Sequence, residues 1–247
     1  MKIRVDEVTH AHGWFGAPVF EGFNLDIPPG RTVLLGPNGA GKSTLMSLLA
    51  SAVLPRKGRI HIGEHRTDRR RDLAPLRRAV GWMPQTIATV TGLTVREQVA
   101  YHAWAKGENR ADAWESALRA LRAVNMADLA DRSVRKLSGG QLRRVGLAQS
   151  IVHRPGVLLL DEPTAGLDPA QRNAFRRILA ELDTSATVLV STHQTGDLSD
   201  LFASVIVLAD GRTGYHGPTA DFLALAPQGD NPERRAEAAY STLLEQR

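Results

Sequence analysis

The chain has 247 residues, of which 43% are hydrophobic and 23% charged, a composition typical of a globular protein. It contains no cysteine, which excludes disulfides, thiolate chemistry and cysteine-ligated zinc. No apolar run reaches the ~18 residues that predict a membrane-spanning helix, and residues 1–6 lack the apolar core of a signal peptide. These features predict a cytosolic chain that folds as one large domain or as a core with a smaller lobe.

The formal net charge of +5 is carried mostly by arginine. A positive balance can favour nucleic acid or an anionic membrane face. The densest arginine cluster lies in residues 66–78, where Asp68 and Asp72 interrupt it and aromatic residues are few. This pattern favours a solvated helix face, with a role at a membrane surface as the alternative.

The first quarter of the chain predicts strands around one helix. Apolar and polar residues alternate up to a Pro-Pro-Gly turn at 28–30, which is the period of antiparallel strands; the apolar positions are Ile3, Val5, Val8, Phe20, Phe23, Leu25 and Ile27. Residues 32–35 predict a buried strand, and a helix is expected from Ser43 to about Val53. A short strand at 58–63 follows, between turns.

The rest of the chain predicts a helical region followed by an alternating one. Residues 93–151 carry apolar and aromatic residues at helical spacing, and we expect Trp104 and Trp114 to fill the core of a helical lobe. From 157 to 208, short apolar runs alternate with helical segments, which predicts a parallel sheet covered by helices. Residues 228–232, directly after Pro227, read as a loose segment.

The most informative motif is a complete phosphate-binding loop of the form G-x-x-x-x-G-K-[ST]. Its glycines let backbone N–H groups turn towards phosphate oxygens. Lys42 can reach the β- and γ-phosphates, and the Ser43 hydroxyl can ligate Mg²⁺. The loop lies between a predicted strand and a predicted helix, so the phosphates would meet a helix N-terminus. It consists of Gly36, Pro37, Asn38, Gly39, Ala40, Gly41, Lys42, Ser43 and Thr44.

A second motif is the apolar run 157–160, which ends in the two carboxylates Asp161 and Glu162. In α/β sheets, ligands bind in the crevice at the carboxyl ends of the strands. Asp161 can hold Mg²⁺ through water, and Glu162 can polarise a water for attack on the γ-phosphate. The alternative is a turn with two solvated acids.

A third motif opens the helix that leads to Ile151. It comprises Leu137, Ser138, Gly139, Gly140 and Gln141. On its own it predicts a serine-capped helix start. The Ser138 side chain, the N–H groups of the two glycines and the helix dipole also make a second anion site. The chain therefore carries two phosphate-binding helix ends but one set of residues for Mg²⁺ and water.

In this order, the phosphate loop, the Leu-Ser-Gly-Gly-Gln segment and the Asp161-Glu162 strand resemble the ATP-binding subunits of ABC transporters. The resemblance covers about residues 1–217. It implies an α/β fold: a P-loop nucleotide hydrolase core with a mainly parallel sheet, an N-terminal antiparallel β subdomain and an inserted helical subdomain. We expect the helical subdomain at about 86–153 and a helical or loose tail at 218–247.

The resemblance also implies roles for single residues. Gln85 matches the Q-loop glutamine, which ligates Mg²⁺ and senses the membrane partner. Asp168 matches the D-loop aspartate, which communicates across the dimer, and His193 matches the switch histidine at the γ-phosphate. Phe15 falls near the aromatic residue that stacks on adenine, with Trp14 as the adjacent candidate.

The mechanism that the resemblance implies needs partners. Two subunits, identical or paralogous, would face head to tail around two ATP molecules, each with Mg²⁺. Each ATP would contact the phosphate loop of one subunit and Ser138, Gly139 and Gly140 of the other. Hydrolysis would part the halves and drive a separate membrane subunit, docked on residues 86–98.

The sequence leaves open the direction of transport and the choice between a transport ATPase and other ABC proteins. The stretches around Asp168 and His193 look most like those of exporters, so we expect export from a subunit on the inner face of the cell membrane. One alternative is a non-transport ABC ATPase that acts on nucleic acid or ribosomes, and we expect no nucleic acid partner because no coiled-coil or zinc insertion and no second cassette is visible. Another alternative is a scaffold that binds ATP without hydrolysing it, but the presence of Glu162 and His193 favours hydrolysis.

Overall fold

The computed structural model describes residues 1–13, 16–182, 185–195, 201–226 and 232–245. The chain divides into two compact units: Met1–Leu76 with Thr187–Arg247 form the first, and Arg77–Ala186 form the second. The expected lobe at 86–153 and the expected domain end at residue 217 stay predictions. None of the helices within the described ranges is long and apolar enough to cross a bilayer.

The first unit contains the expected antiparallel sheet. Its strands lie in the order β2-β1-β4-β5, with bounds β1 Ile3–Ala11, β2 Pro18–Ile27, β4 Lys57–Ile62 and β5 His65–Arg66. Ile3 of β1 pairs with Ile27 on one side and with Ile62 on the other. All three are fully buried, so the alternation in the sequence correctly predicts which side of these strands faces the core.

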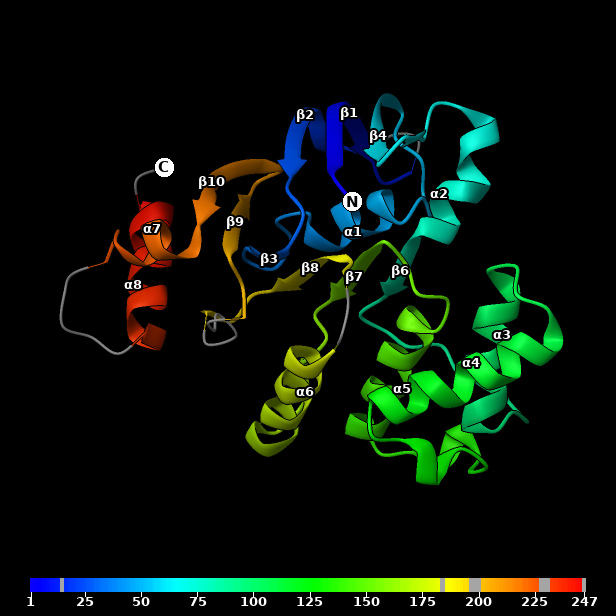
Figure 1. Ribbon diagram of the computed structural model, residues 1–247. Helices are drawn as coiled ribbons and strands as arrows, with labels where there is room; N and C mark the ends of the chain where they lie inside the picture. Colours follow the sequence, from blue (N-terminus) through cyan, green and yellow to red (C-terminus); the bar gives the residue numbers. More distant parts are fainter. Residues whose placement is uncertain (14–15, 183–184, 196–200, 227–231, 246–247) are drawn as a thin grey trace. The chain divides into compact units, whose positions relative to one another are not determined.

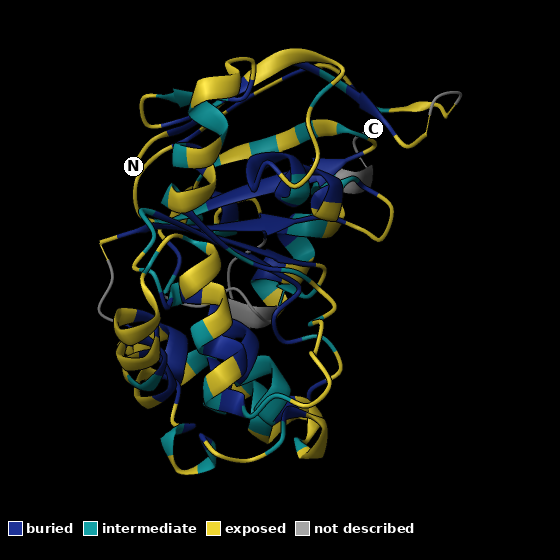
Figure 2. Cartoon of the chain, turned by 90° about the vertical axis from the view of Figure 1, so that its right-hand side faces the viewer, coloured by how far each residue is buried: buried dark blue, intermediate teal, exposed yellow. Residues whose placement is uncertain are grey.

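The same unit holds a mainly parallel set of strands (Figure 1). Here β3 lies between β8 and β9 and runs parallel to both, while β10 runs antiparallel to β9. The buried strands appear dark blue in Figure 2, and β8 is buried at every position. The bounds are β3 Arg31–Leu35, β8 Thr187–Thr192, β9 Ser204–Ala209 and β10 Arg212–Pro218.

The first unit also contains helices. The helix after the phosphate loop is α1, Lys42–Leu49, and the C-terminal segment forms α7, Thr219–Leu223, and α8, Pro232–Glu245. A 3₁₀ turn at Arg70–Asp72 leads into α2, Leu73–Ala79, whose residues from Arg77 onward belong to the second unit. Residues 196–200, in the region expected to alternate between strands and helices, and residues 227–231, in the segment expected to be loose, lie outside the described residues.

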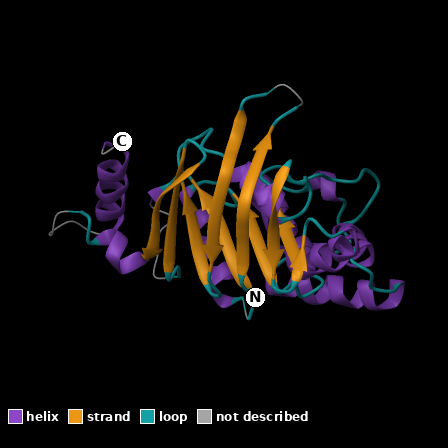
Figure 3. Ribbon diagram, turned by 90° about the horizontal axis from the view of Figure 1, so that it is seen from above, coloured by secondary structure: helices purple, strands orange, loops and turns teal. Residues whose placement is uncertain are grey.

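The second unit combines a parallel strand pair with four helices. Strands β6, Val80–Met83, and β7, Val157–Asp161, pair in register from Val80 opposite Val157. Three of the helices, α3, α4 and α5, pack on one another (Figures 1 and 3). The bounds are α3 Val95–Ala105, α4 Arg110–Ala123, α5 Gly139–Ile151 and α6 Pro169–Glu181, with 3₁₀ turns at Ala127–Leu129 and Val134–Lys136.

The prediction that tryptophans fill the core of the helical lobe is wrong. Trp104 is 57% exposed and Trp114 is 38% exposed. Each directly follows a buried alanine, Ala103 in α3 and Ala113 in α4, and one residue along a helix turns the side chain by about 100°. The core is built from smaller residues, and Arg96 covers the ring of Trp114 at 4.0 Å from its centroid.

Candidate functional site

The phosphate loop connects β3 to α1 in a form that requires glycine. A Cβ on Gly36 would lie 2.3 Å from the carbonyl oxygen of Leu208 in β9. Gly41, the N-cap of α1, has a φ of 100°, and its Cβ would lie 2.9 Å from the ring of Phe20. Left-handed backbone angles of this kind are readily adopted only by glycine. The loop therefore keeps its backbone close to the sheet and leads directly into a helix N-terminus.

Lys42 lies inside this loop. Its side chain is buried, and Nζ donates to the carbonyl oxygens of Gly36, at 2.7 Å, and Pro37, at 3.1 Å. The following residue, Ser43, is exposed on the first turn of α1. A buried ammonium and an exposed hydroxyl at a helix N-terminus are suited to bind an anion and a hard cation, respectively.

His12 is a neighbour of the phosphate loop that sequence reasoning missed. Its Nε2 lies 3.1 Å from Oγ1 of Thr44, and its ring packs edge-on against that of His10, with centroids 5.8 Å apart. Burial, followed by the nearby His12, lowers the pKa of His10 below its ordinary value. The two residues named for adenine stacking, Phe15 and Trp14, lie outside the described residues. The signal in the sequence is a histidine directly after the first strand.

The carboxylate pair lies at the end of β7 in the second unit, where Asp161 is the last residue of the strand and Glu162 follows it. Asp161 and Glu162 are 2% and 5% exposed. Glu162 has a φ of 46°, a left-handed angle that costs a residue with a side chain about 1 kcal/mol or more. A turn follows, in which the N–H of Ala165 donates to the carbonyl oxygen of Glu162 at 3.1 Å. The chain thus holds a buried carboxylate in a strained turn at the end of a strand.

Each unit brings together two of the predicted segments by parallel strand pairing. In the first unit Leu35 of β3 pairs with Thr192 of β8, so the phosphate loop and His193 leave neighbouring strands at the same edge. In the second unit Met83 of β6 pairs with Leu160 of β7. Gln85 and the carboxylate pair therefore also follow neighbouring strand ends, as expected for a ligand site of an α/β sheet.

The Leu-Ser-Gly-Gly-Gln segment forms the N-terminus of α5 as a capping box. The Oγ of Ser138 accepts from the N–H of Gln141 at 3.3 Å, and Oε1 of Gln141 accepts from the N–H of Ser138 at 2.9 Å. Gly139 is exposed and its Cβ position is open, whereas a Cβ on Gly140 would lie 3.0 Å from the side chain of Gln171. The open surface at Ser138 and Gly139 is where this helix end can meet an anion.

Asp168 caps the helix that follows the carboxylate turn. It is exposed, and its carboxylate accepts from the N–H of Gln171 at 2.8 Å, which fixes the start of α6. Gln85 is exposed, and its backbone carbonyl oxygen accepts a hydrogen bond from the side chain of Arg143. The sequence offered no signal for this last contact.

Comparison with known proteins places this geometry in context. The family model described as ABC transporter matches residues 20–165. A cobalt import ATP-binding protein of Rhodobacter capsulatus is 38% identical over 234 residues, which cover 92% of this chain and 84% of that protein.

Two solved structures extend the similarity. The cbiO1 protein of Clostridium perfringens, part of the ABC transporter complex cbiONQ, has a TM-score of 0.77 and 28% identity, with 90% of each chain covered. The ATP-binding cassette MJ0796, in a dimeric post-hydrolysis state bound to ADP and phosphate, has a TM-score of 0.76 and 25% identity. That match covers 87% of this chain and 98% of the cassette.

Proposed function

Because this chain belongs to the family of ABC transporter ATP-binding subunits, and as such binds ATP with Mg²⁺ and hydrolyses it, we propose that it powers transport through a separate membrane-spanning partner. The observation that carries the proposal is that one chain has two helix N-termini whose residues suit an anion. One lies at the buried Lys42, and the other is the exposed start of α5 at Ser138 and Gly139.

Residues at the paired strands β3 and β8, and at the paired strands β6 and β7, are proposed to bind and hydrolyse the nucleotide. Lys42 binds the β- and γ-phosphates, and His193 binds the γ-phosphate. The hydroxyl of Ser43, the amide oxygen of Gln85 and the carboxylate of Asp161 are oxygen ligands of the kind that Mg²⁺ prefers. Asp161 ends β7, while Gln85 and Ser43 lie in the segments after β6 and β3. When bound, Mg²⁺ neutralises charge on the phosphate oxygens.

Glu162 is the proposed general base. Its carboxylate accepts a proton from water, the water oxygen forms a bond to the γ-phosphorus, and the bond from that phosphorus to the β–γ bridging oxygen breaks. The products are ADP and phosphate. Support comes from the burial of Glu162 at the end of β7 and from the strained turn that holds it.

The N-terminus of α5 is proposed to bind nucleotide in a dimer. Ser138, Gly139 and Gly140 of one subunit bind the γ-phosphate held by the phosphate loop of the other, and Asp168 lies at the same dimer surface. The partner is a second copy of this chain or a paralogue. The dimeric state of the similar cassette with ADP and phosphate supports this arrangement, as does the exposure of Ser138 and Gly139.

For the adenine base we propose His12 as a further candidate beside Phe15 and Trp14. Its ring lies beside Thr44, the last residue of the phosphate loop. An imidazole ring can stack on a purine as other aromatic rings do. The proposal concerns the described residues, and Phe15 and Trp14 lie outside them.

The membrane partner is proposed to dock on residues 86–98, in the second unit. Val90 is 45% exposed, and its N–H donates to Oε1 of the buried Gln98, whose Nε2 donates to the carbonyl oxygen of Ala88. Val90 is therefore an exposed apolar side chain on a backbone that Gln98 holds by hydrogen bonds. Part of the segment faces inward, since Val95 is fully buried.

We further propose import rather than the export expected from sequence, with the protein peripheral on the cytoplasmic face of the membrane. The similar protein of Rhodobacter capsulatus is a cobalt import ATP-binding protein, which supports the import direction. Uptake of radioactive cobalt by intact cells with and without this chain is the first assay. Loss of uptake in its absence supports import, and faster loss of preloaded cobalt from wild-type cells contradicts it.

Substitution of Glu162 by Gln tests the proposed function. The amide keeps the size of the side chain but accepts a proton far more weakly. We expect hydrolysis to fall by about a hundredfold or more while ATP still binds, and a dimer to accumulate in ATP and Mg²⁺ on size-exclusion chromatography. Hydrolysis at the wild-type rate in this variant would contradict the catalytic assignment.

A further inference from the structure

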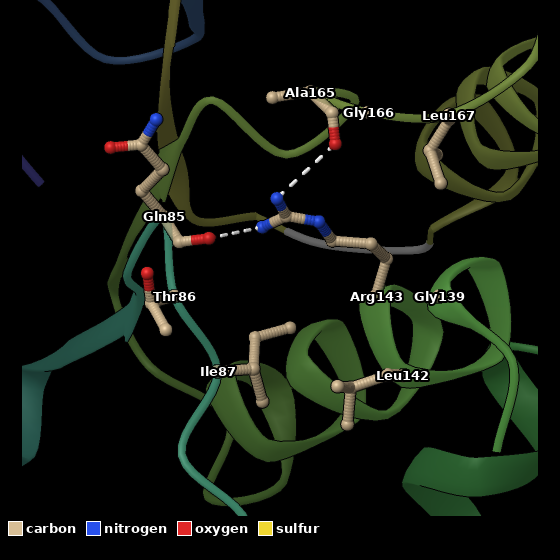
Figure 4. Close-up of a pocket in the computed structure, with 9 residues that line it drawn as sticks. All are labelled: Gln85, Thr86, Ile87, Gly139, Leu142, Arg143, Ala165, Gly166 and Leu167. Carbon is tan, nitrogen blue, oxygen red and sulfur yellow. Dashed lines mark hydrogen bonds between the residues drawn. The ribbon is translucent and has the colours of Figure 1, made fainter.

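One side chain in the second unit joins three of the segments named above. Arg143 lies on the second turn of α5, two residues after the Leu-Ser-Gly-Gly-Gln segment. Its Nη1 donates to the carbonyl oxygen of Gln85 at 2.5 Å, and its Nη2 donates to the carbonyl oxygen of Ala165 at 3.2 Å. Figure 4 shows the guanidinium between these two carbonyl groups. The two contacts span 58 and 22 residues of sequence.

The segment after β6 contacts α5 at two points. The hydrogen bond from Arg143 to the carbonyl oxygen of Gln85 is the first. The other point is Gly146, one turn further along the helix, where a Cβ would lie 2.3 Å from Cδ1 of Ile87. Ile87 is thus pressed against the helix backbone while Gln85 is held by the Arg143 side chain. These two residues, with Arg143, line a pocket of about 320 Å³.

The second contact fixes the turn that presents Glu162. The N–H of Ala165 donates to the carbonyl oxygen of Glu162, and the carbonyl oxygen of Ala165 accepts from Arg143. Arg143 therefore holds the far end of a turn whose first residue has a strained backbone. Burial lowers the pKa of Arg143, and the nearby charges of Glu162 and Asp161 act against this shift.

We propose that Arg143 is a positioning residue that sets the place of Gln85 relative to Glu162 by binding both of their backbone segments at once. The planar guanidinium suits this task because its donors lie on separate nitrogen atoms in a fixed fork. The residue contacts neither ATP nor water in this role and acts through the two segments. The inference rests on the proposed function, since it assigns the effect of Arg143 to hydrolysis.

Steady-state hydrolysis by the full chain tests the kinetic consequence. Arg143→Met keeps the length of the aliphatic stem but removes both hydrogen bonds. Because displacement of a catalytic group by ~1 Å can cost up to ~100-fold in rate, we expect kcat to fall roughly tenfold or more while KM for ATP changes by less than about twofold. Arg143→Lys keeps the charge but places all donors on one nitrogen, so we expect it to restore only part of kcat.

Spin labels test the geometry independently of activity. The sequence has no cysteine, so cysteines introduced at the exposed Thr86 and Ala170 carry the only labels. We expect a narrow distance distribution in the background with Arg143 and a broad one with Arg143→Met. Arg122→Met, at an exposed position of α4, is the matched control, and it is expected to leave both the distances and kcat unchanged.

Three results would overturn the proposal: an unchanged distance distribution in Arg143→Met, a kcat within about twofold of wild type, or full recovery by Arg143→Lys. Should Arg143→Met fail to fold, Arg143→Gln is judged by the same criteria. Failure of the proposed function gives a different result, because Glu162→Gln would then hydrolyse ATP at the wild-type rate while the spin-label distances still respond to Arg143.

Discussion

The stability of the second unit is predicted to depend on pH through His153. This histidine follows α5, and its Nε2 lies 3.3 Å from the carbonyl oxygen of Val80 at the start of β6. The same carbonyl accepts from Nζ of Lys106 at 2.8 Å. Burial, followed by the charge of Lys106, lowers the pKa of His153 from 6.5 to about 4, and His102 acts in the same direction. The contact with Val80 acts against this shift.

The sign and size of the effect follow from proton linkage. Between pH 6.5 and 4 the unfolded chain binds a proton at His153 that the folded chain does not. The free energy of unfolding therefore falls as the pH falls through this window. From pH 7 to pH 5 these two pKa values give a loss of about 2 kcal/mol.

Urea unfolding at pH 7 and pH 5, followed by tryptophan fluorescence, measures this loss. Three of the four tryptophans, Trp82, Trp104 and Trp114, belong to the second unit. His153→Gln is the comparison, because glutamine can donate to the carbonyl of Val80 and does not titrate. Wild type should lose about 2 kcal/mol more than this variant. The reasoning is refuted if the two proteins lose the same free energy to within about 0.5 kcal/mol.

The other predictions concern binding surfaces. Gly139→Asp should leave the monomer able to bind ATP but abolish the ATP-dependent dimer on size-exclusion chromatography, because the new carboxylate suits a helix N-terminus and repels the partner's phosphate; a normal dimer would contradict the role of this helix end. His12→Ala should weaken ATP binding by about tenfold, because one stacked ring is lost, and should weaken binding of inorganic triphosphate much less. Equal losses of affinity for the two ligands would contradict stacking of His12 on adenine. Val90→Asp should disrupt co-purification with the membrane subunit and keep basal hydrolysis near wild type, since Val90 is already exposed; joint loss of both would mean that the segment supports the fold.

The sequence predicts best the features that are written in contiguous residues. The phosphate loop and the Asp161-Glu162 strand are contiguous, and the structure has the predicted strand and helix around the first and the predicted buried strand before the second. The α/β class and the antiparallel N-terminal sheet are confirmed for the same reason, since alternation along β1 and β2 records which residues face the core. The assigned roles of the site residues stay predictions.

Features that depend on contacts between distant segments were missed or misjudged. The helical periodicity of residues 93–151 was visible, but the face occupied by Trp104 depends on how α3, α4 and α5 pack on one another. Small residues such as Ala103 and Ala117 fill that interface instead. The contact of Arg143 with Gln85 joins residues 58 positions apart, and no local pattern in the sequence encodes it.

Several residues proposed to bind nucleotide also hold their own subunit together, which decides how their substitution must be interpreted. Ser138 and Gln141 form the capping box of α5, and Asp168 caps α6. Removal of such a cap costs about 1 kcal/mol, so lost activity at these positions mixes a folding effect with a binding effect. Gly139 separates the two, because its Cβ position meets no other atom within 4 Å. A change of charge there alters the surface offered to the partner's phosphate while the capping box stays in place.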